Sequence, residues 1–154
     1  VLTPDFKGNE KALLRVFKSK PEIFSHNIEC VERISKEIRP QSDWTRSKDV
    51  LAYAVKNNMT TKTGMMVGLG ETDSEVYDTL REISDLGVEI FNIGQYLQPT
   101  KNHLPVSRYV EPDKFNFYKD FALKQGFRVV ESGPLVRSSY HADEQVKLYQ
   151  NQIY

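Results

Sequence analysis

Cysteine is almost absent from this chain of 154 residues, which contains only Cys30. One cysteine excludes an internal disulfide framework and indicates a reducing compartment, because stable disulfides belong to oxidising ones. It also excludes a multi-cysteine array such as Cys-x3-Cys-x2-Cys within this chain. We interpret Cys30 as a small core residue near the start of a buried helix.

An excess of charge of one sign is also lacking, since 21 Lys and Arg balance 21 Asp and Glu. A balanced chain has no global field that would draw it to nucleic acid. No apolar run approaches the ~18 residues that a membrane helix needs, and no secretory or transit pattern is visible at the N-terminus. We therefore expect neither nucleic acid nor a membrane as a partner.

Hydrophobic residues make up 39% and charged residues 27% of the chain, as in a globular protein and unlike a disordered one. The length suffices for one domain with a sizeable core. The first residues, 1–3, look like a strand already in progress. This predicts that the chain is a fragment of something longer.

Short apolar runs alternate with amphipathic stretches along the chain, which predicts an α/β fold with a parallel sheet and right-handed crossovers. Four or five strands are expected. An open doubly wound sheet and part of a β/α barrel both fit this pattern, and residues 97–112 are expected to form a functional loop. The expected helices are 10–18, 30–38, 47–56, 72–86 and 112–125, and the expected strands are 1–6, 23–29, 63–69, 88–93 and 127–130.

The boundaries of two helices are marked by specific residues. Thr72 and Glu75 fit a capping box, in which each side chain bonds the backbone of the other residue. Pro112 suits the first turn of the last helix. Gly87 and Gly126 follow the two helices at the position where glycine usually ends one.

The run Gly-Met-Met-Val-Gly-Leu-Gly-Glu at 64–71 follows a buried strand. Its glycines permit a flat ligand to approach the backbone, and Glu71 would stand at the carboxyl end of the strand, where α/β folds place their chemistry. Taken alone, a glycine-rich turn before a capped helix explains the run better. The spacing gives neither a Walker loop nor Gly-x-Gly-x-x-Gly.

The most informative run is Pro-Leu-Val-Arg-Ser-Ser-Tyr-His-Ala-Asp at 134–143, in which six of ten side chains can donate, accept or ligate. It follows the last expected strand and a turn at 132–134, and it closely resembles the C-terminal signature of lipoyl synthases. The resemblance implies that Ser139 ligates an iron of an auxiliary iron–sulfur cluster, supported by Arg137 and Tyr140, with Ser138 as the alternative ligand. From the residues alone, Ser139 reads as a loop or capping hydroxyl.

Two further sequence blocks resemble motifs of radical S-adenosylmethionine enzymes. Residues 64–71 resemble the Gly-x-Ile-x-Gly-x-x-Glu motif of the fifth barrel strand, and His-Asn-Ile-Glu at 26–29 is similar to the fourth-strand segment. The resemblance implies that Gly68 and Glu71 lie near the cofactor, and that Asn27 and Glu29, on one side of a strand, hold ribose hydroxyls. Without it, Asn27 and Glu29 read as a solvated strand end.

The segment at 93–99 resembles the sixth strand of lipoyl synthases, which implies that Gln95 and Tyr96 reach the adenine. From the residues alone, Tyr96 packs in the core at a strand exit. The family also has a His-Leu-Pro-Val run like that at 103–106. The histidines have no zinc-ligand spacing, and we expect His103 to orient a loop or support the substrate.

The resemblance covers essentially the whole chain. It implies the C-terminal half of a partial (β/α)6 radical-SAM TIM-like barrel, a single domain 1–154 with a closing cluster-ligand segment at 132–154. The N-terminal half, with two cysteine trios, is absent. The implied cofactors are S-adenosylmethionine and two 4Fe-4S clusters, whose cysteine ligands lie outside this chain.

The implied activity is that of lipoyl synthase, a sulfurtransferase that inserts two sulfur atoms at C6 and C8 of a protein-bound octanoyl group. The fragment alone is expected to be inactive. Two alternatives stay open: another radical-SAM sulfur-inserting enzyme of the biotin-synthase kind, and a non-catalytic half-barrel that binds a nucleoside or a carrier protein. An ordinary β/α hydrolase lacks support, because no Gly-x-Ser-x-Gly elbow occurs.

The implied partners are octanoylated lipoyl carrier domains or H protein, and an electron donor such as ferredoxin or flavodoxin. Lys101, Arg108, Lys114 and Arg137 are candidates to face an acidic carrier, although an ordinary solvated surface is the simpler interpretation. The expected location is the bacterial cytoplasm, with the mitochondrial matrix or a plastid as alternatives.

Overall fold

A computed structural model describes residues 1–137 and shows a four-stranded sheet in the order β1-β2-β3-β4. Every pair of neighbouring strands is parallel. Strands that follow one another in space as in sequence are typical of a β/α barrel, whereas the order reverses in a doubly wound sheet. The expected half-barrel is therefore confirmed. The strands are β1 (Phe24–Ser25), β2 (Thr61–Val67), β3 (Ile90–Gln95) and β4 (Val129–Gly133).

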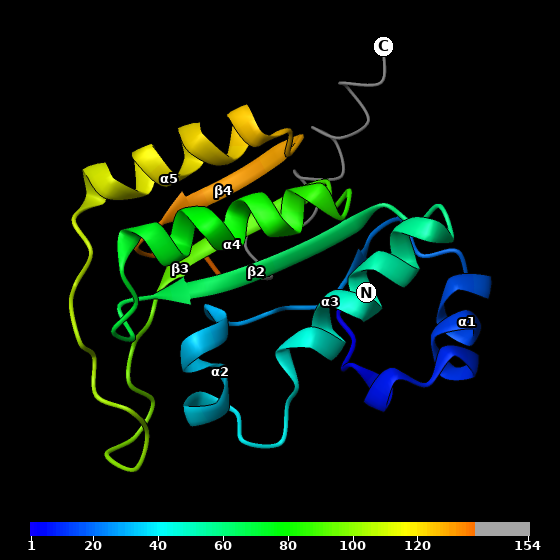
Figure 1. Cartoon of the computed structure of the whole chain (residues 1–154), viewed down its shortest axis with the longest axis horizontal. Helices are drawn as coiled ribbons and strands as arrows, with labels where there is room; N and C mark the ends of the chain where they lie inside the picture. The colour runs from blue at the N-terminus through cyan, green and yellow to red at the C-terminus, as the bar shows by residue number, and fades with distance from the viewer. Residues whose placement is uncertain (138–154) are drawn as a thin grey trace.

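The connections between strands are helical. Figure 1 shows α4 lying across β2 and β3, and α5 running beside β4. The long loop between β3 and α5 descends beside α2 in the same view. The helices are α1 (Glu10–Lys18), α2 (Glu32–Ile38), α3 (Trp44–Lys56), α4 (Asp73–Asp85) and α5 (Pro112–Gln125), with a 3-10 turn, η1 (Phe6–Gly8).

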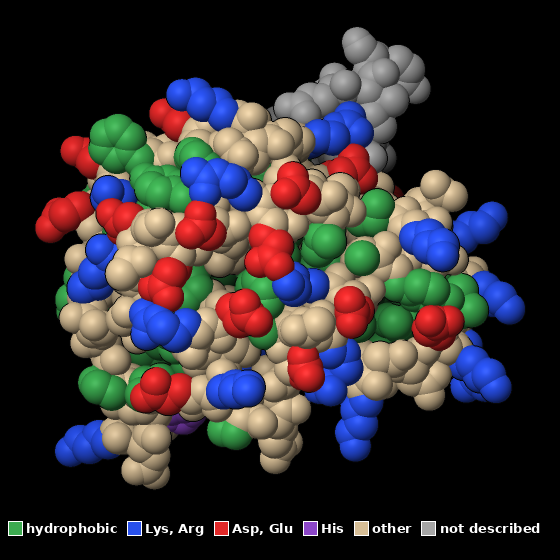
Figure 2. All heavy atoms as spheres, in the orientation of Figure 1, with side chains coloured by type: hydrophobic (Ala, Val, Ile, Leu, Met, Phe, Trp, Pro, Cys, Tyr) green, Lys and Arg blue, Asp and Glu red, His purple; other side chains and the backbone are tan. Residues whose placement is uncertain are grey.

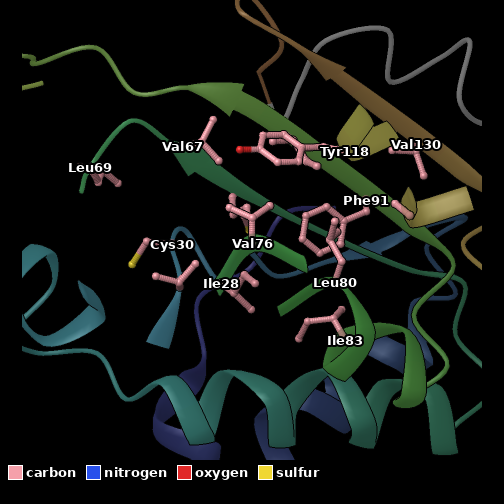
Figure 3. Close-up of a cluster of buried hydrophobic side chains, with 14 of the residues drawn as sticks. Ile28, Cys30, Val67, Leu69, Val76, Leu80, Ile83, Phe91, Tyr118 and Val130 are labelled. Carbon is pink, nitrogen blue, oxygen red and sulfur yellow. The ribbon is translucent and has the colours of Figure 1, made fainter. Parts of the chain in front are cut away.

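The two faces of the sheet differ in chemistry, because successive side chains of a strand point to opposite sides. One face packs against α4 and α5, as the buried cluster in Figure 3 shows. Each large apolar side chain buried there contributes about 1.5–3 kcal/mol. This core includes Met65, Val67, Phe91, Ile93 and Val130 from the strands and Val76, Leu80, Ile83, Phe115, Tyr118 and Ala122 from the helices.

The opposite face, called here the polar face, carries glycines and polar side chains at the alternate positions. In the register of the sheet, Gly64 lies beside Asn92, and Gly94 lies beside both Met66 and Gly133. Because glycine has no side chain, other groups can approach the strand backbone closely at these positions. This face, as the register defines it, consists of Lys62, Gly64 and Met66 on β2, Ile90, Asn92 and Gly94 on β3, and Val129, Glu131 and Gly133 on β4. Its polar and glycine positions lie toward the carboxyl ends of the strands, beyond the apolar pair Ile90 and Val129.

Most of the expected elements are found with shifted ends, but the strand expected at 1–6 is reduced to an isolated bridge between Leu2 and Ser25, and η1 follows it. Helix α1 has the expected bounds. Helix α3 begins earlier than expected, because the side chain of Asp43 accepts a hydrogen bond from Arg46 N and caps it. The expected turn at 132–134 is wrong at its first two residues, since Ser132 and Gly133 continue the pairing of β4 with β3.

The expected strand at 23–29 is interrupted. Only Phe24–Ser25 is regular, and pairing resumes at an isolated bridge between Glu29 and Met65. Between them the hydroxyl of Thr63 donates to His26 O (2.8 Å) and accepts from Ile28 N (3.2 Å). A side chain of β2 thus bonds the backbone of this segment where the regular strand pairing is interrupted.

The residues expected to mark the ends of α4 and α5 are confirmed in that role. Thr72 accepts a hydrogen bond from Glu75 N, and the Glu75 carboxylate accepts one from Thr72 N at 2.8 Å. Pro112 starts α5. Gly87 and Gly126 adopt φ values of +86° and +115°, which glycine tolerates best.

The charged side chains are mixed in sign over the face seen in Figure 2, where Lys and Arg stand among Asp and Glu. This agrees with the balanced composition. Within residues 1–137, no helix combines the length and the apolar character that crossing a membrane requires.

His26 joins the N-terminal segment to α3. Its Nδ1 lies 3.0 Å from Thr3 O and its Nε2 lies 3.0 Å from the hydroxyl of Ser47. A carbonyl can only accept, so Nδ1 carries the proton and Nε2 accepts from Ser47. Burial lowers the pKa of His26, partly offset by the hydrogen bond to Thr3 and the charge of Asp5.

We predict that this histidine makes stability depend on pH. Its folded pKa lies below the unfolded value of 6.5, so its contribution is complete above pH 6.5 and is lost as the pH falls below it. The loss is at most about 1.4 kcal/mol per pH unit. The free energy of unfolding, measured with urea at several pH values between 5 and 8, should depend less steeply on pH for His26→Gln than for the wild type. Parallel curves would contradict the prediction.

Candidate functional site

Two hollows open near the carboxyl ends of β1 to β3, where parallel α/β folds usually bind ligands. They share Glu29 and Met66. The smaller, called here the inner cavity, has a volume of about 90 Å³ and is lined by Asn27, Glu29, Gly64, Met65, Met66, Asn92, Gly94, Val136 and Arg137.

The larger hollow, called here the outer cleft, has a volume of about 580 Å³, within the usual range for a small-molecule site. Its walls come from the end of α2 and from the loop after β3. They combine apolar surface with a few charged groups. The lining residues are Glu29, Glu37, Ile38, Arg39, Met66, Tyr96, Leu97, Pro99, Asn102, His103, Leu104 and Pro105.

Asn27 and Glu29 stand side by side in the inner cavity. The Oδ1 atom of Asn27 is buried and has no hydrogen-bond partner in the described part of the chain. Burial raises the pKa of Glu29, and the charge of Arg39 and a hydrogen bond from Asn27 partly offset this. Glu29 also adopts a left-handed φ of +70°, a strained conformation of the kind found at functional sites. The pair offers acceptors to a ligand that carries hydroxyl or N–H donors.

Tyr96 and His103 line the outer cleft, as parts of one loop. The Tyr96 hydroxyl donates to Leu104 O at 2.8 Å. His103 is exposed, and its Nδ1 lies 2.8 Å from the hydroxyl of Thr100. Gln98 donates to the carbonyl of His103 at 2.7 Å. These bonds connect residues of one loop, and the role expected of His103 stays a prediction.

Gly68, Glu71 and Gln95 line neither hollow. The Glu71 carboxylate is buried and accepts hydrogen bonds from Gly68 N (2.8 Å) and Leu69 N (2.9 Å). The Gln95 amide donates to Arg108 O (3.1 Å) and accepts from Val110 N (2.9 Å). Both side chains bind the backbone of the loops that follow β2 and β3, outside the lining of the cleft.

Gly68 is required where these loops cross. Its φ is +99°, and a Cβ there would lie 2.3 Å from Gln95 Nε2 and 2.5 Å from Arg108 O. Ser107 N also donates to Gly68 O at 2.8 Å. At Gly68, the space that the missing side chain leaves is therefore filled by other residues of the chain, and no ligand can enter it.

Two of the four cations expected to face an acidic carrier are already paired. Asp73 accepts from Arg108 (2.8 Å) and Lys114 (2.7 Å), and from the hydroxyl of Tyr118 (2.6 Å). Although burial raises the pKa of Asp73, the hydrogen bonds from Lys114, Tyr118 and Arg108 hold it well below its usual range. An acidic partner would then depend mainly on Lys101 and Arg137.

Arg137 is the last described residue. Its Nη1 atom donates to Val136 O at 2.7 Å, and the side chain lies at the edge of the inner cavity. Ser138, Ser139 and Tyr140 lie outside the described residues. The role of Ser139 as an iron ligand stays a prediction.

Residues 1–137 contain no group of three or more His, Cys, Asp or Glu side chains that could hold a metal ion. Cys30 belongs to the buried core, as expected. Burial, with a smaller effect of the Glu29 charge, raises the pKa of its thiol to about 12. A thiol ligates iron as the thiolate, so Cys30 does not fit that role. By contrast, Asn27, Glu29 and the adjoining cleft fit the polar and flat parts of a nucleoside.

Of the residues that line the inner cavity, Asn92 lies outside the sequence blocks singled out above, and Gly94 and Val136 lie within such blocks but were given no role. The Asn92 amide donates to Arg137 O at 3.3 Å. The signal was present, since Asn92 and Gly94 alternate with the apolar Phe91 and Ile93, as one polar face of a strand does.

The sequence of this chain matches one protein family and is similar to several known proteins. The profile of the Radical SAM superfamily matches residues 1–83. The chain is 52% identical over 149 residues to a lipoyl synthase of Rubrobacter xylanophilus, covering 96% of this chain and 46% of that protein. It is 48% identical over 146 residues to one of Flavobacterium johnsoniae (94% and 51%), and 51% identical over 143 residues to one of Chlorobaculum parvum (92% and 49%). The chain thus spans about half the length of these relatives.

We predict that Gly68→Ala destabilises the chain more than Gly70→Ala. Both positions have a left-handed φ, which costs alanine about 1–2 kcal/mol. Only at Gly68 does the new methyl overlap other atoms, which adds about 1–3 kcal/mol. Urea unfolding of the two variants measures the difference, and equal losses would contradict the assigned contact.

We also predict that Cys30 resists alkylation in the folded chain. A buried thiol with a pKa of about 12 exposes almost no thiolate at pH 8. Iodoacetamide followed by mass measurement should find no label in the native chain and one label in guanidinium chloride. A Cys30→Ser variant gives the background. Stoichiometric labelling of the native chain would refute the buried assignment.

Proposed function

The chain belongs to the radical SAM superfamily, and we propose that it forms the C-terminal part of a lipoyl synthase. The enzyme would insert two sulfur atoms at C6 and C8 of a protein-bound octanoyl group. The observation that carries this proposal is the 46–52% identity to lipoyl synthases over more than nine-tenths of the chain. The site geometry supports it, because an acceptor pair adjoins a cleft of nucleoside size.

In this proposal Asn27 and Glu29 hold the ribose hydroxyls of S-adenosylmethionine, which supplies the radical that removes hydrogen from the substrate. The unpartnered Oδ1 of Asn27 accepts one donor. An unsatisfied buried acceptor costs about 1–3 kcal/mol, so a bound hydroxyl stabilises the site by satisfying it. The apolar walls of the outer cleft exclude water from the bound group.

Tyr96 and His103 would contact the bound group from the wall of the outer cleft, in which Tyr96 is largely buried and fixed by its hydrogen bond to Leu104 O. Gln95, Gly68 and Glu71 would contribute from behind that wall. They fix the loop exits after β2 and β3, and the position of Tyr96 depends on these exits. Their effect on the cofactor would be one of orientation.

Ser139 is proposed to ligate an iron of the auxiliary cluster, with Arg137 and Tyr140 close to it. Iron–sulfur clusters are usually held by cysteine thiolates. An alkoxide is a harder ligand, and the charge of bound iron favours the loss of its proton. The remaining ligands of two 4Fe-4S clusters would come from cysteines outside this chain.

The proposed partners are an octanoylated lipoyl carrier domain or H protein and an electron donor such as ferredoxin or flavodoxin. The proposed location is the bacterial cytoplasm. The relatives from Rubrobacter xylanophilus and Flavobacterium johnsoniae are bacterial proteins, and the charged surface seen in Figure 2 is mixed in sign. A carrier would then be selected by local contacts more than by a general attraction.

The proposal can be tested with a hybrid enzyme, in which this chain replaces the matching half of the Rubrobacter xylanophilus lipoyl synthase. We expect the reconstituted hybrid to convert an octanoylated carrier into the lipoyl form, detected by mass spectrometry. Ser139→Ala should abolish product and release about half the iron, because one of two four-iron clusters loses a ligand.

Ser138→Ala is the matched control and should keep most of the iron and activity. Equal losses from both substitutions would remove the assignment of Ser139. A folded hybrid that cleaves S-adenosylmethionine but makes no lipoyl product would contradict the proposed function itself.

A further inference from the structure

The segment that follows β4 turns back and lies against the polar face of β3. The turn is closed by a hydrogen bond from Val136 N to Gly133 O at 3.1 Å. It brings the backbone of Val136 over Gly94, a residue of the neighbouring strand. A Cβ at Gly94 would lie only 2.3 Å from Val136 O, and 3.3 Å from Arg137 Nη1.

Asn92 holds the same segment from two residues earlier on β3. Its amide donates to Arg137 O at 3.3 Å. Asn92 and Gly94 share one face of the strand, so one residue supplies a donor where the other supplies space. Val136 is buried as a result, and it lines the inner cavity together with Arg137.

We propose that Gly94 is a positioning residue: its missing side chain admits the carbonyl of Val136 and thereby sets Arg137 at the edge of the inner cavity. The inference rests on the proposed function only for its catalytic consequence, since Arg137 leads directly into the serine pair. The seating of the segment is a property of the chain itself.

The need for glycine at this position is steric. Gly94 has no left-handed φ, so its extended backbone is one that alanine adopts freely. The obstacle is a backbone oxygen, which cannot rotate away as the end of a flexible side chain can. An added methyl must therefore displace the segment, by about 1 Å if an ordinary carbon–oxygen contact is to be restored.

Gly133 offers a matched control, because it is the register partner of Gly94 on β4. A Cβ there would lie 3.5 Å from a methyl carbon of Val136, an ordinary contact. Both substitutions add one methyl to the same row of the sheet, and only that at Gly94 meets the backbone of the segment.

Hydrogen exchange of the chain, read by mass spectrometry on peptides spanning 134–137, tests the proposal. We expect Gly94→Ala to speed exchange there about tenfold or more, because the bond from Val136 N opens. Gly133→Ala should leave it within about twofold, and β2 and α4 should be unaffected in both. Unchanged exchange at 134–137 in a folded Gly94→Ala chain would overturn the proposal.

If Gly94→Ala does not fold, Asn92→Ala decides, because it removes the donor without adding bulk. It should raise exchange at 134–137 by a smaller factor, and no rise would overturn the proposal. In the hybrid enzyme, Gly94→Ala should lower kcat by about 10²-fold, since a misplacement of about 1 Å has that effect.

The two proposals fail separately. If the hybrid made no lipoyl product while Gly94→Ala still released the segment, the proposed function would fall and the positioning role would stand. If the hybrid were active and Gly94→Ala kept both kcat and slow exchange, the positioning role would be wrong and the function would remain.

Discussion

The site depends on the alternation of side chains along two adjacent parallel strands, β2 and β3. The residues that point to one side form the apolar core with α4 and α5. Several of the alternate residues are small or polar, with Gly64 beside Asn92 and Gly94 beside Gly133. A shift of one residue in register would exchange the two faces. The core that holds the sheet together therefore also fixes which groups line the inner cavity.

Around this sheet, loops are held by side chains that reach from one strand exit to another. Glu71 binds the turn after β2, and Gln95 binds the loop after β3. Gly68 allows the two exits to touch. The wall of the outer cleft is thus built on contacts that lie behind it, and the residues that shape the cleft are not all residues that line it.

The α/β class and the ends of α4 and α5 were predictable, because periodicity and capping residues such as Thr72 act locally, and the half-barrel followed from the family resemblance. In the structure Asn27 and Glu29 line the same cavity, although the strand that was expected to carry both residues is interrupted. Gln95 and Glu71 line neither hollow and bind loop backbone instead, which the sequence did not reveal because a strand exit does not encode its direction; their predicted place near a cofactor stays a prediction. The seat of Val136 on Gly94 depends on a contact between distant segments, which no local pattern encodes.

The loop that walls the outer cleft is attached to the barrel in two ways with different physics. Through Gln95 it is held by a neutral amide, which binds Arg108 O and Val110 N and has no charge to screen. Through the side chain of Arg108 it is held by the ion pairs around Asp73, which are partly exposed. Dissolved ions weaken the second attachment and leave the first nearly intact. In concentrated salt the hydrogen bonds of Gln95 therefore carry a larger share of what holds this loop to the barrel than the ion pairs of Arg108 do.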